Sequence, residues 1–291
     1  MSQLELSIAR EFDKKDRDVV NVSSVPQRSP FRYPGGKTWL VPTVRKWLSQ
    51  SKTVPMLIEP FAGGGIVSLT AAFEGYTDNI IMSELDEEVA AVWQTILTED
   101  NSWLASAILD FQLNVDNVNK VIQAEGKTIK ETALSTILKN RTYHGGIITK
   151  GSGFLKHGEN GKGIHSRWYP ETLYKRISAI DTIKHKIQFK FEDAFDVIES
   201  EIDNCDAYFF IDPPYVKAAK RLYSLYDVDH QRLFELTSRI QGRFLLTYDD
   251  APEVREYAAK YNLKYKSIPM RTTHHLKKHE LLITDNLDWL A

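Results

Sequence analysis

Apolar and polar positions along the chain form blocks that predict strands followed by helices. Short apolar runs at 56–59 and 80–84 are followed by segments with spaced apolar positions, at 66–74 and 87–97. Short apolar runs bounded by turn signals indicate strands, and apolar residues three and four apart indicate helices. Further strand-like runs lie at 187–191, 207–212, 243–248 and 280–284. The pattern predicts an α/β sheet domain.

The strand–helix pattern is interrupted in the middle of the chain. Residues 101–140 favour helices without strands between them, a loop with seven glycines follows at 145–163, and 170–183 reads as another helix. A loop of that length is too long for a simple connector. We therefore divide the chain into an N-terminal tail (1–27), a sheet domain (28–99 and 186–291) and an inserted helical domain (100–185).

Composition is that of an ordinary globular protein, with 42% hydrophobic and 26% charged residues among 291. No run of eighteen apolar residues is present, which argues against a transmembrane helix. The N-terminus lacks the apolar core of a signal peptide, and a single cysteine, Cys205, suits a reducing compartment. We therefore expect a cytoplasmic protein.

Charge is distributed unevenly, although the net charge is only −2. Residues 139–176 contain eight Lys or Arg and two acids, whereas 192–206 contains seven acids and no Lys or Arg. Such asymmetry is typical of a local face that binds a polyanion. His274, His275 and His279 are not spaced with other ligands, so we expect phosphate or surface contacts there and no metal site.

Two glycine-rich segments suggest ligand binding. The first, RYPGGKT at 32–38, lacks both the glycine and the preceding strand of a phosphate-binding loop. The second, EPFAGGGIVSL at 59–69, lies between a strand and a helix, and its glycines permit close approach of a ligand to the backbone. Glu84 ends the next strand, where an acid typically binds a ribose hydroxyl. A tight turn followed by a surface acid is the alternative.

The stretch FFIDPPY at 209–215 places a carboxylate at the end of a predicted strand. Asp-Pro is also common in ordinary turns, but a turn requires neither a second proline nor the aromatic Tyr215. The Asp212 carboxylate and an adjacent backbone carbonyl can accept both N–H bonds of an exocyclic amine, which turns its lone pair toward an electrophile. Tyr215 can stack on a base that has left the duplex.

These motifs together resemble the Dam-type adenine-N6 DNA methyltransferases. Four blocks occur in that family's order, and a weaker fifth ends the resemblance near residue 285: FRYPGGK (31–37), EPFAGGG (59–65), LKNRTYHGG (138–146), FFIDPPY (209–215) and KKHELLIT (277–284). The resemblance implies a Rossmann-like methyltransferase sheet with an inserted helical target-recognition domain. It also implies S-adenosylmethionine as cofactor and double-stranded DNA as substrate.

The resemblance assigns roles to residues by position. Catalysis and the grip on the target base are expected from Asp212, Pro213 and Tyr215. Cofactor contacts are expected from Tyr33, Lys37, Glu59, Phe61, Gly63, Gly65, Glu84, Asp193 and Asp212. DNA contacts are expected from Asn140, Arg141, Lys150, Lys156 and Arg167.

One departure bears on specificity. Dam enzymes that read GATC have an arginine where this chain has Thr149, so we expect another recognition sequence. Cytosine-N4 methylation is the nearest alternative activity, because the same chemistry serves both amines. A catalytically silent DNA- or cofactor-binding module is the alternative from another class. A cognate restriction enzyme is a further expected partner.

Overall fold

The sheet runs through the centre of the molecule and contains seven strands among the residues that the structure describes. The computed structural model describes residues 25–149, 151–215, 228–271 and 277–290. In chain order the strands are β1 (Met56–Glu59), β2 (Ile80–Ser83), β3 (Ile187–Lys190), β4 (Ala207–Ile211), β5 (Arg243–Asp249), β6 (Lys264–Arg271) and β7 (Lys277–Thr284). Their order across the sheet is β3-β2-β1-β4-β5-β7-β6.

The first five strands in that order run parallel to one another, and β7 pairs antiparallel with both of its neighbours, β5 and β6. The strand order reverses between β1 and β4. In open α/β sheets ligands bind beyond the carboxyl ends of the strands at such a reversal. Glu59 at the end of β1 and Asp212 just after β4 therefore lie at the expected position for a site.

The central strands are buried on both faces, which explains their continuous apolar runs. Successive side chains of a strand point to opposite faces. In β4, Tyr208 and Phe210 join one apolar cluster, whereas Phe209 and Ile211 join the other.

Helices on each face complete the two clusters. Those of the first cluster include α2 (Val41–Leu48), α3 (Ile66–Phe73) and α4 (Glu87–Ile96). Those of the second are α9 (Ala194–Glu201), α11 (His230–Arg239) and α12 (Pro252–Lys260).

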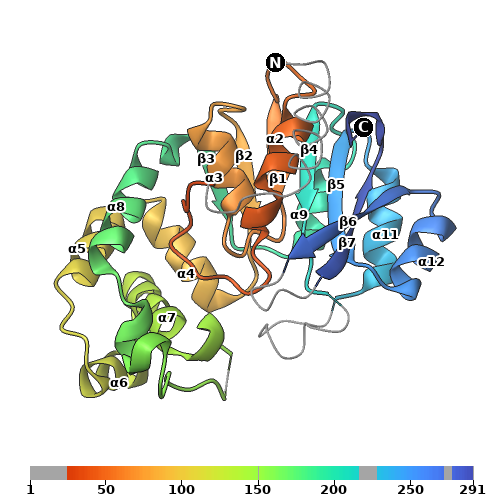
Figure 1. Cartoon of the computed structure of the whole chain (residues 1–291). Helices are drawn as coiled ribbons and strands as arrows, with labels where there is room; N and C mark the ends of the chain where they lie inside the picture. The colour runs from red at the N-terminus through yellow and green to blue at the C-terminus, as the bar shows by residue number, and fades with distance from the viewer. Residues whose placement is uncertain (1–24, 150, 216–227, 272–276, 291) are drawn as a thin grey trace, which may run out of the picture.

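The helices of the expected inserted domain gather on the β3 side of the sheet (Figure 1). They are α5 (Asn101–Leu109), α6 (Val115–Gln123), α7 (Ile129–Thr142) and α8 (Pro170–Asp181). Short 3-10 turns connect other parts of the chain: η2 (Lys37–Leu40), η3 (His144–Gly146), η4 (Glu159–Gly161), η5 (Gly163–Arg167), η6 (Lys184–Lys186) and η7 (Asp288–Leu290).

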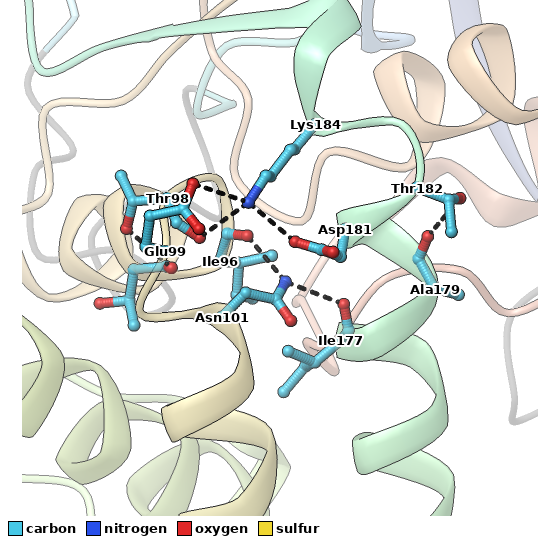
Figure 2. Close-up of polar contacts among 10 residues, drawn as sticks. Ile96, Thr98, Glu99, Asn101, Ile177, Ala179, Asp181, Thr182 and Lys184 are labelled. Atoms are coloured by element: carbon cyan, nitrogen blue, oxygen red, sulfur yellow. Dashed lines mark hydrogen bonds and ion pairs between the residues drawn. The ribbon is translucent and has the colours of Figure 1, made fainter.

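The two ends of this helical segment are joined to each other. Buried Asn101 donates through Nδ2 to the carbonyls of Ile96 (2.7 Å) and Ile177 (3.0 Å). Lys184 forms an ion pair with Asp181 at 2.9 Å and contacts residues 98 and 99 (Figure 2). The segment therefore begins and ends at one place, beside the ends of α4 and α8.

The sequence pattern is confirmed for the fold class and for all six predicted strands. It missed helix α2 and strand β6. Along β6, Lys264 and Lys266 are exposed while Tyr265 is half-buried. A charged edge strand of this kind has few apolar positions to recognise. Of the tail predicted at 1–27, residues 1–24 lie outside the described residues.

Candidate functional site

A cavity of about 540 Å³ lies at the carboxyl ends of β1, β2 and β4. This volume is in the range of small-molecule and cofactor sites. Its walls include the glycine loop after β1, Glu84 after β2, Asp193 after β3 and Asp212 after β4. The inserted segment contributes another wall through residues 140–141 and 145–148.

The glycine loop holds its shape through close packing against Tyr33. Gly63 has a φ of +46°, and a Cβ there would stand 2.6 Å from the Tyr33 ring. Its carbonyl accepts a hydrogen bond from Trp93 Nε1 at 2.8 Å. Gly65, also predicted to bind cofactor, is the N-cap of α3. Only glycine fits at position 63, and the loop is therefore fixed before any ligand enters.

Glu84 anchors the other side of this pocket. Its Oε2 accepts from the Gly63 N–H at 3.0 Å, and its Oε1 accepts from the N–H groups of Leu85 and Asp86 at 2.9 and 3.0 Å. Burial raises the pKa of the Glu84 carboxyl to about 7. Oε2, which accepts only one of these bonds, still has capacity for a further donor, as a ribose hydroxyl would require.

Three more residues predicted to bind cofactor line the same cavity: Glu59, Phe61 and Asp193. Asp193 caps helix α9 by accepting from Phe195 N at 2.8 Å. Glu59 is 2% exposed and accepts from Ser68 N at 2.9 Å. Burial raises the pKa of Glu59 to about 8. Glu59 is therefore mainly protonated at neutral pH.

Asp212 lies in a network of side chains from distant parts of the sequence. Its Oδ2 pairs with Lys37 Nζ at 2.8 Å. Its Oδ1 accepts from Thr247 Oγ1 at 2.7 Å and from the Tyr215 hydroxyl at 3.2 Å. Lys37 is 3% exposed and also donates to the Gly35 carbonyl at 2.9 Å. The structure thus joins Lys37, predicted as a cofactor contact, to the predicted catalytic carboxylate.

Tyr215 is held on three sides. Its ring stacks on Tyr248 with centroids 5.6 Å apart and planes 22° apart, and Lys37 Nζ lies 4.9 Å from the ring centroid. Its hydroxyl is 3.2 Å from Glu280 Oε2 as well as 3.2 Å from Asp212. A tyrosine hydroxyl has one proton, so it donates to one carboxylate at a time.

Glu280 belongs to this network, although the sequence analysis did not assign it a role. The side chain is 6% exposed, and its strand position faces Asp249 of β5. Burial raises the pKa of Glu280 to about 7, with Lys37 opposing and Asp212 reinforcing the shift. The signal was present in KKHELLIT, because an acid interrupts an otherwise basic and apolar strand.

The predicted DNA contacts divide by exposure. Asn140 and Arg141 are 2% and 4% exposed, Arg167 is half-buried, and Lys156 is exposed. Lys150 lies outside the described residues. Burial lowers the pKa of Arg141 to about 9, and the charges of Arg176, Arg32 and Arg167 lower it further. Sequence reasoning missed Arg32 and Arg176, which line the cavity.

Two searches of the described residues complete the site. No group of three or more His, Cys, Asp or Glu side chains is arranged to hold a metal ion there. Within the same ranges, no helix is both long and apolar enough to cross a membrane. His274 and His275 lie outside the described residues, and His279 is exposed.

The strand order, the glycine loop after β1 and the acid after β2 define a Rossmann-like fold. Residues 33–271 match the family of D12 class N6 adenine-specific DNA methyltransferases. The chain therefore belongs to that family.

Proteins similar to the chain include a phage enzyme and a protein of solved structure. It is 26% identical over 263 residues to a DNA N-6-adenine-methyltransferase of Escherichia phage P1. That match covers 84% of this chain and 32% of the phage protein, so the chain spans about a third of that relative's length. A solved structure of a putative RNA methyltransferase from Pyrococcus horikoshii aligns with a TM-score of 0.40 and 11% identity, covering 94% of this chain and 97% of that one.

Proposed function

We propose that the chain transfers a methyl group from S-adenosylmethionine to the N6 amino group of adenine in double-stranded DNA. The observation that carries the proposal is the position of Asp212. It stands at the strand-order reversal, in the cavity that also contains the glycine loop. Family membership supports the same activity. A cytoplasmic location and a cognate restriction enzyme as partner remain part of the proposal.

The cavity fits S-adenosylmethionine. Gly63 is buried under the Tyr33 ring, so a ligand would meet Tyr33 and half-buried Gly64 at this wall. Glu84 would accept from the ribose hydroxyls, and Asp193 with Phe195 would line the adenine end. When bound, the cofactor supplies an electrophilic methyl group on its sulfonium sulfur.

Asp212 would orient the target amine. One carboxylate oxygen and the backbone carbonyl of Pro213 would accept the two N–H bonds, and the nitrogen lone pair would then face the methyl group. Lys37 and Thr247 fix the carboxylate from two sides before the base arrives. Such preorganisation of polar groups is a major source of rate acceleration.

Tyr215 would contact the face of the target base. A base inside a duplex cannot reach a cavity at the sheet edge, so the adenine must leave the stack. Stacking on an aromatic ring is worth about 1–3 kcal/mol per base. The packing of Tyr215 on Tyr248 fixes the plane of the ring, and a base would have to reach it on the side of Lys37 Nζ.

DNA binding is proposed for the inserted segment. Burial lowers the pKa of Arg141 most, and the nearby charges of Arg176, Arg32 and Arg167 lower it further, so this arginine lies among like charges. A phosphate group would relieve that repulsion. Exposed Lys156 and the predicted contact Lys150 would add to the same charge, in the sequence-independent manner of phosphate contacts.

The test is methyl transfer from radiolabelled S-adenosylmethionine to duplex DNA, followed by digestion to nucleosides and mass spectrometry. N6-methyladenine is the expected product. N4-methylcytosine would replace the proposal by its nearest alternative, and an absence of transfer would favour a silent binding module. Sequencing of the methylated positions gives the recognition site, which we expect to differ from GATC because Thr149 replaces an arginine.

A further inference from the structure

A short N-terminal segment, residues 29–33, is held by the inserted helices. Asn140 at the end of α7 accepts from the Arg32 N–H at 2.9 Å and donates to the Arg32 carbonyl at 3.1 Å. Arg141 donates to the Pro30 carbonyl, and Arg176 of α8 donates to the Ser29 carbonyl at 3.2 Å. Two helices that are remote from this segment in sequence therefore fix its backbone.

Asn140 is the centre of this contact. Its amide serves both backbone groups of Arg32 and also donates to the Gly146 carbonyl at 2.9 Å. The side chain is 2% exposed. Removal of a buried partner leaves the other group unsatisfied, which costs more than the bond itself contributes.

Gly146 brings the start of the long loop against the same segment. Its φ is +75°, and a Cβ there would stand 2.8 Å from the Arg32 carbonyl oxygen. A side chain at this position would push the segment away from the loop. The backbone of Arg32 is thus set by the inserted domain from two directions.

The other end of the segment reaches the proposed reaction centre. Tyr33, the next residue, packs against the glycine loop at Gly63 and Gly64. Lys37 follows four residues later and pairs with Asp212. A shift of Arg32 would therefore move residues that shape the cofactor pocket and hold the catalytic carboxylate.

We propose that Asn140 is a positioning residue that couples the inserted domain to the cofactor pocket through residues 29–33. DNA bound at the inserted domain and cofactor bound at the glycine loop then strengthen each other's binding. The proposal rests on the proposed function. It also gives Asn140 a role other than the direct DNA contact expected from its position in the sequence.

The arginines explain why bound DNA would favour the state in which residues 29–33 are bonded to the inserted helices. Arg32, Arg141 and Arg176 line one cavity, and two of them bond the segment directly. A phosphate among them would oppose their mutual repulsion most when the segment is held. A ligand shifts a conformational equilibrium only through such a difference in binding between two states.

The experiment measures the affinity of S-adenosylhomocysteine, which cannot be consumed, by calorimetry. The measurement is made with and without an unmethylated duplex that contains the recognition sequence found by the sequencing above. We expect the duplex to tighten binding by about fivefold or more in the wild type, a size typical of coupled sites. In Asn140→Ala the affinity without DNA should fall, and the tightening should drop below about twofold. By reciprocity the ligand should tighten duplex binding by the same factor in each protein.

Asn117→Ala is the matched control. Asn117 also belongs to the inserted helices and donates to a backbone carbonyl, that of Gln112 at 2.9 Å, but it lies outside the cavity. Asn117 is half-buried, unlike the 2% exposed Asn140, and this variant should keep both the affinity and the tightening. If Asn140→Ala does not fold, Asn140→Asp keeps the acceptor for Arg32 N–H and loses both donated bonds, so the tightening should again be lost.

Two outcomes would overturn the coupling. One is a wild-type protein in which the duplex leaves the affinity unchanged. The other is an Asn140 variant that binds the ligand more weakly but keeps the full tightening, which would make Asn140 a structural support only. Both differ from failure of the proposed function, in which the wild type methylates no DNA.

Discussion

The cofactor side and the target-base side of the cavity are built from different groups. On the cofactor side, backbone N–H groups and close-packed glycine surround one carboxylate, Glu84. On the base side, the side chains of Lys37, Tyr215 and Thr247 contact the second carboxylate, Asp212. Glu280 joins the same network through the Tyr215 hydroxyl. The first carboxylate organises a loop, whereas the second is itself held by its neighbours.

This difference has consequences for substitution. A group that accepts from backbone contributes to the shape of a pocket, so its loss should weaken binding of the ligand. A group that is fixed by other side chains toward a reacting atom should affect the rate more than binding. The predictions below test that division.

The largest effect is expected at Asp212. Asp212→Asn keeps the shape of the side chain but removes its charge and leaves a single acceptor oxygen, for which Lys37, Thr247 and the amine would compete. We expect the single-turnover methylation rate to fall at least about 100-fold below that of wild type, in the range of other lost orienting groups. S-adenosylhomocysteine affinity should change little.

Asp206→Asn, on the exposed turn before β4, is the matched control and should keep the wild-type rate. Retention of more than about a tenth of the rate in Asp212→Asn would remove Asp212 from the chemistry. A large loss of cofactor affinity there would instead place Asp212 on the cofactor side.

Glu84→Ala tests the other carboxylate. The N–H groups of Gly63, Leu85 and Asp86 lose their acceptor, and so would the ribose hydroxyls. We expect S-adenosylhomocysteine to bind about tenfold more weakly, as for one lost hydrogen bond to a charged group. The rate at saturating cofactor should fall by less than the affinity.

Exposed Glu87, at the start of α4, offers the control for this change. Its replacement by alanine should leave the affinity as it is. Equal affinity in Glu84→Ala and wild type would show that the ribose is bound elsewhere.

How far each side could be predicted follows from the same division. Glu59, the glycines and Glu84 lie within 26 positions of one another, and Asp212 and Tyr215 are three apart, so each forms a local motif. The partners of Asp212 come from separate segments: Lys37 precedes it by 175 residues, and Glu280 follows Tyr215 by 65. No local spacing marks such contacts, and only the fold brings them together.

Burial was the second property that the sequence did not reveal. LKNRTYHGG has the polar composition of an exposed helix end, yet Asn140 and Arg141 are almost completely buried. They are buried because the Pro30 and Arg32 backbone supplies partners more than a hundred residues away. The expectation of direct DNA contact for these two residues followed from their position in the family resemblance, where they belong to the block LKNRTYHGG.

Glu280→Gln should have a smaller effect, on rate alone. When ionised, Glu280 accepts the hydrogen bond that the Tyr215 hydroxyl donates, so Asp212 can accept from the amine instead. The neutral amide is a weaker acceptor, so the tyrosine hydroxyl would turn to Asp212 and compete with the substrate. We expect a single-turnover rate about three- to tenfold lower at pH 8 and little change in cofactor affinity, in line with a neutral rather than charged hydrogen bond.

The pH profile distinguishes this role from a structural one. The pKa of Glu280 is raised to about 7, so wild-type Glu280 loses its charge as the pH falls through 7. At saturating cofactor, the wild-type rate should therefore approach that of Glu280→Gln below pH 6. A constant ratio of the two rates from pH 6 to 8 would contradict the prediction. The control is Glu253→Gln, at an exposed residue of α12, which should follow the wild-type profile throughout.

The smallest effect on catalysis is expected at Glu59, where the change should appear in stability. The unfolded side chain ionises near its ordinary pKa, whereas burial raises the folded pKa to about 8. The unfolded state therefore releases its proton first as the pH rises, and the free energy of unfolding falls between about pH 4.5 and 8.

Glu59→Gln removes this group from the titration and keeps an acceptor for Ser68 N–H. We expect its melting temperature to exceed that of wild type by several degrees at pH 8, about 2–4 °C for each kcal/mol in a protein of this size, and by much less at pH 5. A difference that is equal at both pH values would show that Glu59 is ionised in the folded protein, and it would then belong with Asp212 among the charged groups of the site.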